Sequence, residues 1–506
     1  MKLSPAALIL PFCALLLSSN ANAQTFNGYA LYNLQNQNTT YLIDKDGSIA
    51  HSWSLPTSCN YTVKLKPNGN IMRGAVNTGN SLNGAAIGGK VQEFNSTGGL
   101  VWEYVYSNSQ HCSHHDLEIL PNGNVILTAW EVKTTTELTA AGRTNATTSL
   151  WPDHFIELQQ NGTSATIVWE WHYWDHLIQD TDPSKPNYGV VANNPQLLDI
   201  NAVTASGGGP GGSSGDWFHT NGIGYNEALD QLVFTSRYAS EVFIIDHSTT
   251  TAEAASHSGG NSGKGGDFLY RWGKPSNYDS NAAQTIAAAC HDPRWIEDDG
   301  RPNAGKIQFF NNSGGSGSSS VIDVIDAPES GFMYTYGGSS YAPSTYDWRH
   351  NCLASNSGQG ASKTMSNGNI FVNVSQQYMY EVNPTTGATV WQYNASPTKA
   401  FRYECDDPGI IALLGADPCG LLSISEETIS QVELFPNPSN GIFKVDGFQL
   451  GQNELTMTVV DMFGKEILSV SNVLELDLTN FPEGVYFVQL NFNNEKVITK
   501  KITSIR

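Results

Sequence analysis

The feature that most constrains the fold of this chain is a recurring pair of short hairpins. One hairpin joins two apolar strands through a turn with Gly and ends in Trp, at 41–53, 91–104, 155–171 and 380–393, and with a longer tip at 242–272. The other has an Asn-Gly turn, at 63–72, 117–127 and 363–374. Asn-Gly suits a type I′ turn, which needs positive φ at both central residues. Two hairpins make a four-stranded sheet, and a radial array of such sheets is a β-propeller.

Five such units are clear, and segment 320–336 predicts a weak outer hairpin that would complete a sixth. We therefore expect an all-β chain with a six-bladed β-propeller. A β-sandwich, or two smaller β domains, is the alternative that this pattern leaves open. Gly/Ser-rich stretches at 206–215, 257–266 and 313–320 interrupt the repeats. Such runs predict either solvated loops or mobile lids over a channel mouth.

Residues 1–23 have the pattern of a secretory signal peptide. Lys2 supplies the positive charge, 6–17 is apolar, and Ala21-Asn22-Ala23 is a small-residue cleavage site. The apolar run is too short to span a bilayer, and no later stretch is long enough, so we expect no transmembrane segment. The chain is predicted to enter the periplasm during export.

Charge and cysteine content narrow the class further. The 47 Asp and Glu outnumber the 26 Lys and Arg, which argues against a nucleic-acid partner. An even number of cysteines in an exported chain predicts disulfides, and six remain after the signal peptide: Cys59, Cys112, Cys290, Cys352, Cys405 and Cys419. The last two are close enough in sequence to close one short loop. No CxxC pair is present, which makes a zinc ribbon unexpected.

The end of the chain has a different pattern. We expect the propeller to occupy 24–400, a linker 401–431, and a small β-sandwich of short alternating strands 432–506. This tail resembles the type A C-terminal sorting domain of the type IX secretion system of Bacteroidetes. The matching pieces are Phe435-Pro436-Asn437-Pro438, Gly441, the 461–464 turn, Gly484-Val485-Tyr486 and the basic end Lys496, Lys500 and Lys501. The resemblance implies the type IX machinery as partner, a secreted or cell-surface location, and a tail that is removed or used for attachment.

Polar side chains gather where the inner hairpins begin, which in a propeller lies on the central channel. They are His114, His115, Asp116, His219, Asn221, Arg237, His291, Asp292, His350 and Lys363. Arg and His donors suit an anion with several oxygens, and a neutral imidazole is also a nucleophile. Transfer of an anionic group such as sulfuryl fits this set, because positioning and electrostatics dominate such reactions.

Three motifs give a more specific resemblance. A His-His-Asp before a Pro-Asn-Gly-Asn hairpin, a His-x-Asn followed by Ser-Arg, and a later His-Asp-Pro-Arg-Trp resemble the PAPS-independent arylsulfotransferase family, over residues 27 to 394. The resemblance implies a six-bladed propeller that moves a sulfuryl group from an aryl sulfate ester to a phenol through a sulfohistidine. No cofactor and no metal are expected.

The resemblance also implies roles for individual residues. His291 falls on the nucleophile; His219, Asn221 and Arg237 fall on sulfuryl-binding residues; His115 falls on a further channel histidine. His114, His350 and Lys363 are predicted to bind substrate, although Lys363 stands where Arg or Gln is expected.

Three other functions stay open from the residues alone. A non-catalytic surface propeller could bind glycan or protein, since propellers have many functions. A metallo-hydrolase could use His114, His115, Asp116, His219 and His291, although no HExxH occurs. A calcium-stabilised propeller could use Asp298-Asp299-Gly300, which lacks EF-hand spacing.

Overall fold

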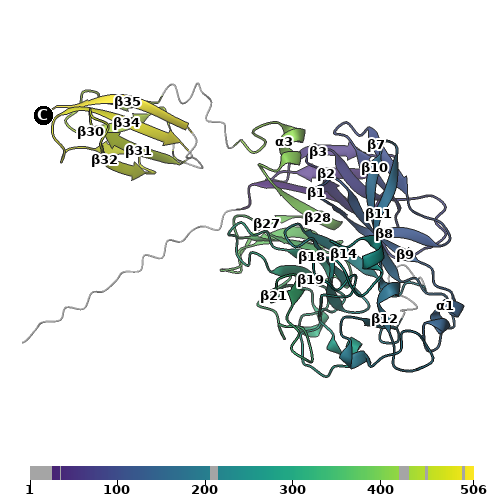
Figure 1. Cartoon of the computed structure of the whole chain (residues 1–506). Helices are drawn as coiled ribbons and strands as arrows, with labels where there is room; N and C mark the ends of the chain where they lie inside the picture. The colour runs from purple at the N-terminus through teal and green to yellow at the C-terminus, as the bar shows by residue number, and fades with distance from the viewer. Residues whose placement is uncertain are drawn as a thin grey trace, which may run out of the picture. The chain divides into compact units, whose positions relative to one another are not determined.

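The computed structural model describes residues 25–34, 36–204, 215–420, 432–448, 450, 454–492 and 496–505 (Figure 1). The predicted signal peptide, all but the last residue of the Gly/Ser stretch 206–215 and the segment 421–431 of the predicted linker lie outside these ranges. The chain divides into two compact units, Met1–Ala416 and Asp417–Arg506.

The larger unit contains six four-stranded antiparallel sheets. In order from the innermost strand outward, sheets 1 to 3 are formed by β28 (Pro397–Glu404), β1 (Gly28–Leu34), β2 (Thr39–Ile43) and β3 (Ile49–Ser54); β4 (Cys59–Leu65), β5 (Ile71–Val76), β6 (Gly89–Phe94) and β7 (Leu100–Val105); and β8 (His111–Ile119), β9 (Val125–Glu131), β10 (Asp153–Asn161) and β11 (Ser164–His172).

Sheets 4 to 6 continue the same arrangement. They are formed by β14 (Thr220–Asn226), β15 (Gln231–Ser236), β16 (Glu241–Asp246) and β17 (Tyr270–Trp272); β18 (His291–Trp295), β19 (Ile307–Asn311), β20 (Val321–Ile325) and β23 (Trp348–Asn351); and β24 (Ala361–Thr364), β25 (Ile370–Val374), β26 (Tyr378–Val382) and β27 (Thr389–Tyr393). The innermost strands of successive sheets contact one another, and β24 contacts β28, so the array closes. The predicted all-β propeller architecture is confirmed.

The repeated Trp residues join five of the six sheets to the sheet that follows. Their indole N–H groups donate to an oxygen of the following sheet or its loops, in the pairs Trp53 to Asn95 O, Trp102 to Ser164 O, Trp169 to Thr249 Oγ1, Trp272 to Pro343 O and Trp391 to Lys45 O, all within 2.7–3.1 Å. A buried indole needs such a partner for its N–H. The Trp that ends each of these outer hairpins is therefore a contact between sheets.

The boundary expected at residue 400 differs from the structure. Strand β28 runs on to Glu404 and pairs with β1, with Tyr29 opposite Tyr403 (Figure 1). It supplies the innermost strand of sheet 1, so the two ends of the larger unit share one sheet. Helix α3 (Pro408–Leu414) follows, with Asp407 as its N-cap and Ile410 fully buried. The part of the chain expected to be a linker therefore begins with ordered structure.

The outer hairpin expected at 320–336 is also different. Strand β20 pairs with β23, whereas β21 (Glu329–Ser330) and β22 (Met333–Tyr334) form a small sheet of their own. The fourth strand of sheet 5 is thus β23. The repeat pattern did not predict it, because a long segment that contains β21 and β22 separates it from β20.

The smaller unit is a β-sandwich, as expected. One sheet contains β29 (Glu433–Phe435), β30 (Ile442–Asp446) and β33 (Glu475–Asp477), and the other β31 (Leu455–Val460), β32 (Glu466–Ser471), β34 (Gly484–Phe492) and β35 (Lys496–Ser504). Alternate residues of both sheets, among them Phe443, Met457 and Val488, form one buried apolar cluster. Across the described ranges, no helix combines the length and apolarity needed to cross a membrane.

The cysteines correct one expectation. Cys405 and Cys419 are disulfide-bonded, but the other four are free: Cys59, Cys112, Cys290 and Cys352. The expectation of a chain without free thiols is therefore wrong: Cys112, Cys290 and Cys352 lie in or against apolar clusters, and Cys59 is buried beside the start of sheet 2. Free cysteine commonly packs in this way, as a small apolar side chain.

Candidate functional site

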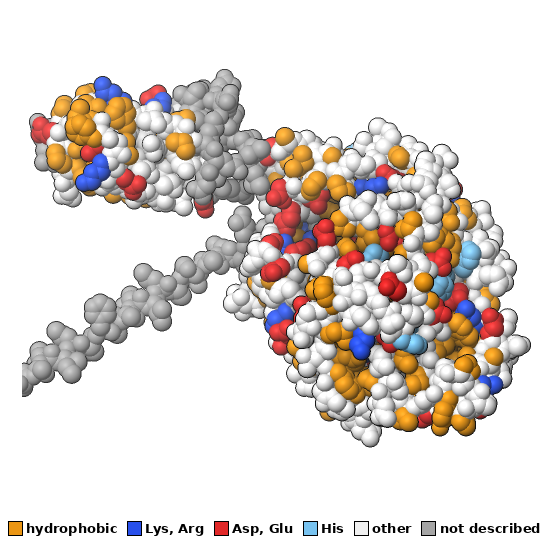
Figure 2. All heavy atoms as spheres, viewed as in Figure 1, with side chains coloured by type: hydrophobic (Ala, Val, Ile, Leu, Met, Phe, Trp, Pro, Cys, Tyr) orange, Lys and Arg blue, Asp and Glu red, His pale blue; other side chains and the backbone are white. Residues whose placement is uncertain are grey.

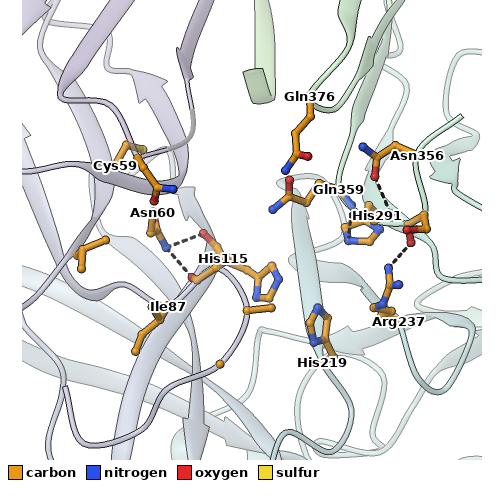
Figure 3. Close-up of a pocket in the computed structure, with 17 residues that line it drawn as sticks. Cys59, Asn60, Ile87, His115, His219, Arg237, His291, Asn356, Gln359 and Gln376 are labelled. Carbon is orange, nitrogen blue, oxygen red and sulfur yellow. Dashed lines mark hydrogen bonds between the residues drawn. The ribbon is translucent and has the colours of Figure 1, made fainter. Parts of the chain in front are cut away.

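A pocket of 400 Å³ opens where the inner strands begin (Figure 3). Polar residues from each of the six sheets and their loops line it: Asn36, Asn60, His115, His219, Arg237, His291, Asn356, Gln359 and Gln376. Residues separated by hundreds of positions in sequence therefore share one site. The four residues predicted to converge, His115, His219, Arg237 and His291, are all among them.

The backbone at the start of three inner strands is irregular. The register shifts at the beginning of β14 and β18 and between Ser113 and Leu117 of β8, as at a β-bulge. His115, His219 and Asp292 have positive φ values of 48°, 56° and 51°. Such values are uncommon for residues other than Gly and are concentrated at functional sites. A bulge re-aims side chains, which explains how consecutive residues on these strands reach different environments.

His291 is held by hydrogen bonds at both ring nitrogens. Nδ1 lies 2.7 Å from Asn312 Oδ1 and 2.8 Å from the Ala289 carbonyl oxygen. Both partners are acceptors, so Nδ1 carries the proton and Nε2 has the lone pair. The Gln359 backbone N–H donates to Nε2 over 2.9 Å. Burial, with added repulsion from Arg237, holds the pKa of His291 well below its usual value, so the ring is neutral at pH 7.

His219 forms a pair with a buried carboxylate. Its Nδ1 lies 2.5 Å from Asp216 Oδ2, and Trp130 Nε1 donates to the other oxygen of Asp216 over 3.2 Å. Burial alone would raise the pKa of Asp216, but the charge and hydrogen bond of His219 lower it below its usual value. The carboxylate therefore fixes the ring orientation and leaves Nε2 as the free nitrogen.

His115 is connected through His114 to the buried carboxylate of Asp153. Its Nδ1 is 2.7 Å from His114 Nδ1, and His114 Nε2 is 2.8 Å from Asp153 Oδ1. The ring of His115 is 4.6 Å from that of His219, centroid to centroid. Burial lowers the pKa of His115 well below its usual value, and the neighbouring His219 adds to this effect. His114 does not line the pocket and instead supports His115 from behind.

Arg237 brings the positive charge. Its Nη1 donates to the Ser357 carbonyl oxygen over 2.5 Å, and its backbone N–H donates to the His219 carbonyl oxygen over 3.1 Å. A Cβ on Gly358 would lie 2.9 Å from Arg237 Nη1, so a larger residue there would press on the guanidinium. Burial lowers the pKa of Arg237 from its usual value. Arginine keeps its charge in proteins, and anions of several oxygens are its ordinary partners.

The aspartates that follow two of these histidines face a lysine. Lys399 Nζ, on β28, lies 2.5 Å from Asp116 Oδ2 and 2.8 Å from Asp292 Oδ1, and all three side chains are buried. Burial alone would lower the pKa of Lys399, but Asp116 and then Asp292 raise it. The Ser362 N–H donates to the other oxygen of Asp292. The ion cluster thus connects sheets 1, 3 and 5 beside the site.

Three of the predicted residues lie elsewhere. Lys363 forms a 2.9 Å ion pair with Glu297 in a separate pocket of 260 Å³ that shares no lining residue with the first. His350 is on the outermost strand of sheet 5, with Nε2 2.8 Å from the Tyr380 hydroxyl. Asn221 is buried and accepts a hydrogen bond from Thr235 Oγ1, away from the lining. His350 was expected at the start of an inner strand because the outer hairpin of this sheet was predicted to end at residue 336. The structure instead places the outermost strand of sheet 5 at Trp348–Asn351, which includes His350.

Sequence reasoning did not find several supporting residues. Asp216 stands three positions before His219, a spacing that could have suggested the pair. Asn312 lies in a loop without a motif. Lys399 was not predicted, because the sequence pattern did not identify β28, the strand that carries it.

Two family models match parts of this chain. Residues 16–330, more than half of the chain, match the family model for arylsulfotransferases, and 433–504 match the secretion system C-terminal sorting domain. No curated protein matched. Similar solved structures include the β-propeller domain of Cps50 (Swd1) from Myceliophteria thermophila, at 8% identity over 74% of this chain and 88% of that chain with a TM-score of 0.35. A putative 6-phosphogluconolactonase from Bacteroides fragilis has 11% identity over 76% and 99%, with a TM-score of 0.34.

Proposed function

Because the chain belongs to the arylsulfotransferase family, we propose that its 400 Å³ pocket moves a sulfuryl group from an aryl sulfate ester to a phenol through a sulfohistidine. The observation that carries this proposal is the convergence of His115, His219, Arg237 and His291 on one pocket. Together they supply a neutral nucleophile, neighbouring groups for proton transfer and a fixed positive charge, which are the requirements of the reaction.

His291 is the nucleophile in this proposal. Its Nε2 lone pair attacks sulfur, the bond from sulfur to the aryl oxygen breaks, and the phenol leaves with a proton from His219. In the second half the acceptor phenol returns its proton to the same group and attacks sulfur, and the N–S bond breaks. Asn312 and the Ala289 carbonyl keep the Nδ1 proton in place, so one tautomer serves both halves.

The hydrogen bond from the Gln359 N–H to His291 changes partner during the proposed reaction. The Gln359 N–H occupies the Nε2 lone pair in the free enzyme and must release it as the N–S bond forms. The amide then lies beside the new sulfuryl group, where it donates to one of the sulfuryl oxygens. Arg237 neutralises the negative charge that these oxygens carry throughout.

Incubation with 4-nitrophenyl sulfate tests the proposal. The wild type should release nitrophenol faster when a phenol acceptor is present, and the peptide with His291 should gain the mass of one SO₃. His291→Ala should abolish both signals. His51→Ala, which changes a surface histidine on β3, should leave both unchanged.

A wild type that releases no phenol from any aryl sulfate would contradict the proposal and favour a binding propeller. A sulfuryl group found on His219 instead would keep the transfer but reassign the nucleophile. The C-terminal sorting domain directs the chain to the cell surface or the exterior by type IX secretion.

A further inference from the structure

A second group of chemically reactive side chains lies outside the catalytic pocket. His176, at the end of the 3-10 helix η1 (Tyr173–His176), meets His257 and Asp267, which are the residues that flank the Gly/Ser stretch 258–266. The Nδ1 atoms of both histidines and a carboxylate oxygen of Asp267 all lie within 4.8 Å of one another. Three such donor atoms at this spacing are the protein part of a tetrahedral metal site.

The surroundings of His176 point to a cation independently. Its side chain is fully buried, with Nε2 2.8 Å from the Ala254 carbonyl oxygen and Nδ1 2.9 Å from Asp267 Oδ1. Both nitrogens thus face oxygen acceptors. A backbone carbonyl on the far nitrogen is the usual support of a metal-binding histidine.

We propose that His176, His257 and Asp267 bind one zinc-class divalent metal ion. Two imidazoles and one carboxylate suit zinc and similar metals, whereas calcium and magnesium prefer oxygen alone. His257 Nδ1 now lies 2.7 Å from Asp267 Oδ1. Ligand atoms about 2.1 Å from zinc are roughly 3.4 Å apart, so these two side chains must separate by about 0.7 Å. The 61% exposed side chain of His257 can make this movement.

The site has two consequences for the molecule. The metal would hold both ends of the 258–266 loop against η1, which stabilises the closed loop. His257 also lines a 460 Å³ pocket with Trp174 and Tyr188, so a water or small ligand can occupy the fourth position of the metal. This metal is separate from the sulfuryl chemistry, because none of its three ligands lines the catalytic pocket.

Zinc uptake by the full chain tests the proposal. After dialysis against ZnCl₂, the wild type should retain one equivalent more than His257→Ala, with affinity at that site reduced at least about 100-fold by the substitution. His51→Ala is the matched control, because His51 lies on β3 and belongs neither to the three ligands nor to the 460 Å³ pocket. It should retain the wild-type amount. Figure 2 shows that histidine side chains lie at several separate places on one face of the larger unit. His257 is exposed, so its loss should not unfold the chain, which circular dichroism can check.

Cobalt provides a direct readout. Co²⁺ should give the visible absorption of a tetrahedral centre in the wild type and in His51→Ala, and not in His257→Ala. Equal zinc uptake by wild type and His257→Ala, or a cobalt spectrum that survives the substitution, would overturn the proposal. Neither readout depends on sulfuryl transfer, so failure here leaves the proposed function untouched.

Discussion

Lys399 Nζ lies 2.5 Å from Asp116 Oδ2, which connects the last strand of the propeller to the residue directly after His115. The same ammonium group reaches Asp292, directly after His291, over 2.8 Å. In both places the histidine turns into the pocket and the aspartate turns to the lysine. One buried cation therefore fixes the strands that carry two of the three pocket histidines.

Replacement of this cation should be costly. Lys399→Met would leave two buried carboxylates without their shared partner, so we expect a loss of about 3–5 kcal/mol in the free energy of unfolding, measured by urea denaturation. Lys363→Met, which breaks an ion pair with the 45% exposed Glu297, should cost less than about 1 kcal/mol. Equal losses in the free energy of unfolding for the two substitutions would show that the buried ion cluster stabilises the fold no more than an exposed ion pair.

The pH profile of the reaction should report the neutral state of His291. Because its pKa is held well below the usual value, kcat/KM with an aryl sulfate should stay flat from pH 8 to below about 6.5 and fall only at lower pH. Arg237→Gln removes one cause of that shift, so the acid limb should move to higher pH while the rate drops about 10²–10³-fold. An acid limb unmoved in Arg237→Gln would contradict the assignment.

A different histidine should control stability in alkali. His247 lies 2.7 Å from Asp230 Oδ1 and 3.0 Å from Glu157 Oε2; burial would lower its pKa, but these two partners raise it to about 9. A raised folded pKa gives stability that is complete below the unfolded value of about 6.5 and lost as pH rises through 9. The free energy of unfolding should fall by up to about 1.4 kcal/mol per pH unit between these values from this group alone.

His247→Gln should remove the part of the slope that His247 contributes, because glutamine does not titrate. His172, whose pKa burial would lower but Glu131 and Glu170 raise to about 9, keeps its own part. His51→Gln, the surface control, should keep the full slope. Urea denaturation at several pH values between 6 and 9 measures both. The same slope in wild type and His247→Gln would show that another group is responsible.

Truncation should separate the two units. A chain ending at Gly420 retains β28, α3 and both disulfide-bonded cysteines, so its thermal transition should match that of the larger unit in the full chain. A chain ending at Ser396 lacks β28 and leaves sheet 1 with β1 as its innermost strand, so it should melt much lower or fail to fold. Calorimetry of the two chains decides, and equal transitions would mean that β28 contributes little. The shorter chain is close to the boundary that the hairpin repeats alone predict.

Thiol titration should count the free cysteines. A chain without residues 1–23 should show four reactive thiols under denaturing, non-reducing conditions. The folded protein should react slowly, because burial raises the pKa of Cys59 and of Cys112 to about 11. A count near zero in denaturant would restore the disulfide pairing that the even number of cysteines suggests.

The sequence by itself determined the β class, the repeated unit and the separate tail. Hairpin turns and strand alternation are local. The Asn-Gly sites do form tight turns, but only Gly69, Gly123 and Gly368 have positive φ there, so the expected type I′ conformation is wrong. The motif residues His115, His219, Arg237 and His291 could also be identified, because His-Asp, His-x-Asn and Ser-Arg are short local patterns. Family resemblance assigned their roles from that pattern.

Only the tertiary structure decided how the ring closes and which partners support the site. Strand β28 pairs with β1 across more than 360 residues, a contact that no local pattern reports. Lys399 meets Asp116 and Asp292 only because of that closure, and Gln359 reaches His291 from a neighbouring sheet. His350 and Lys363 carry suitable chemistry, but their strand positions direct them elsewhere. Local preference sets the strands, whereas long-range pairing sets which side chains face one another.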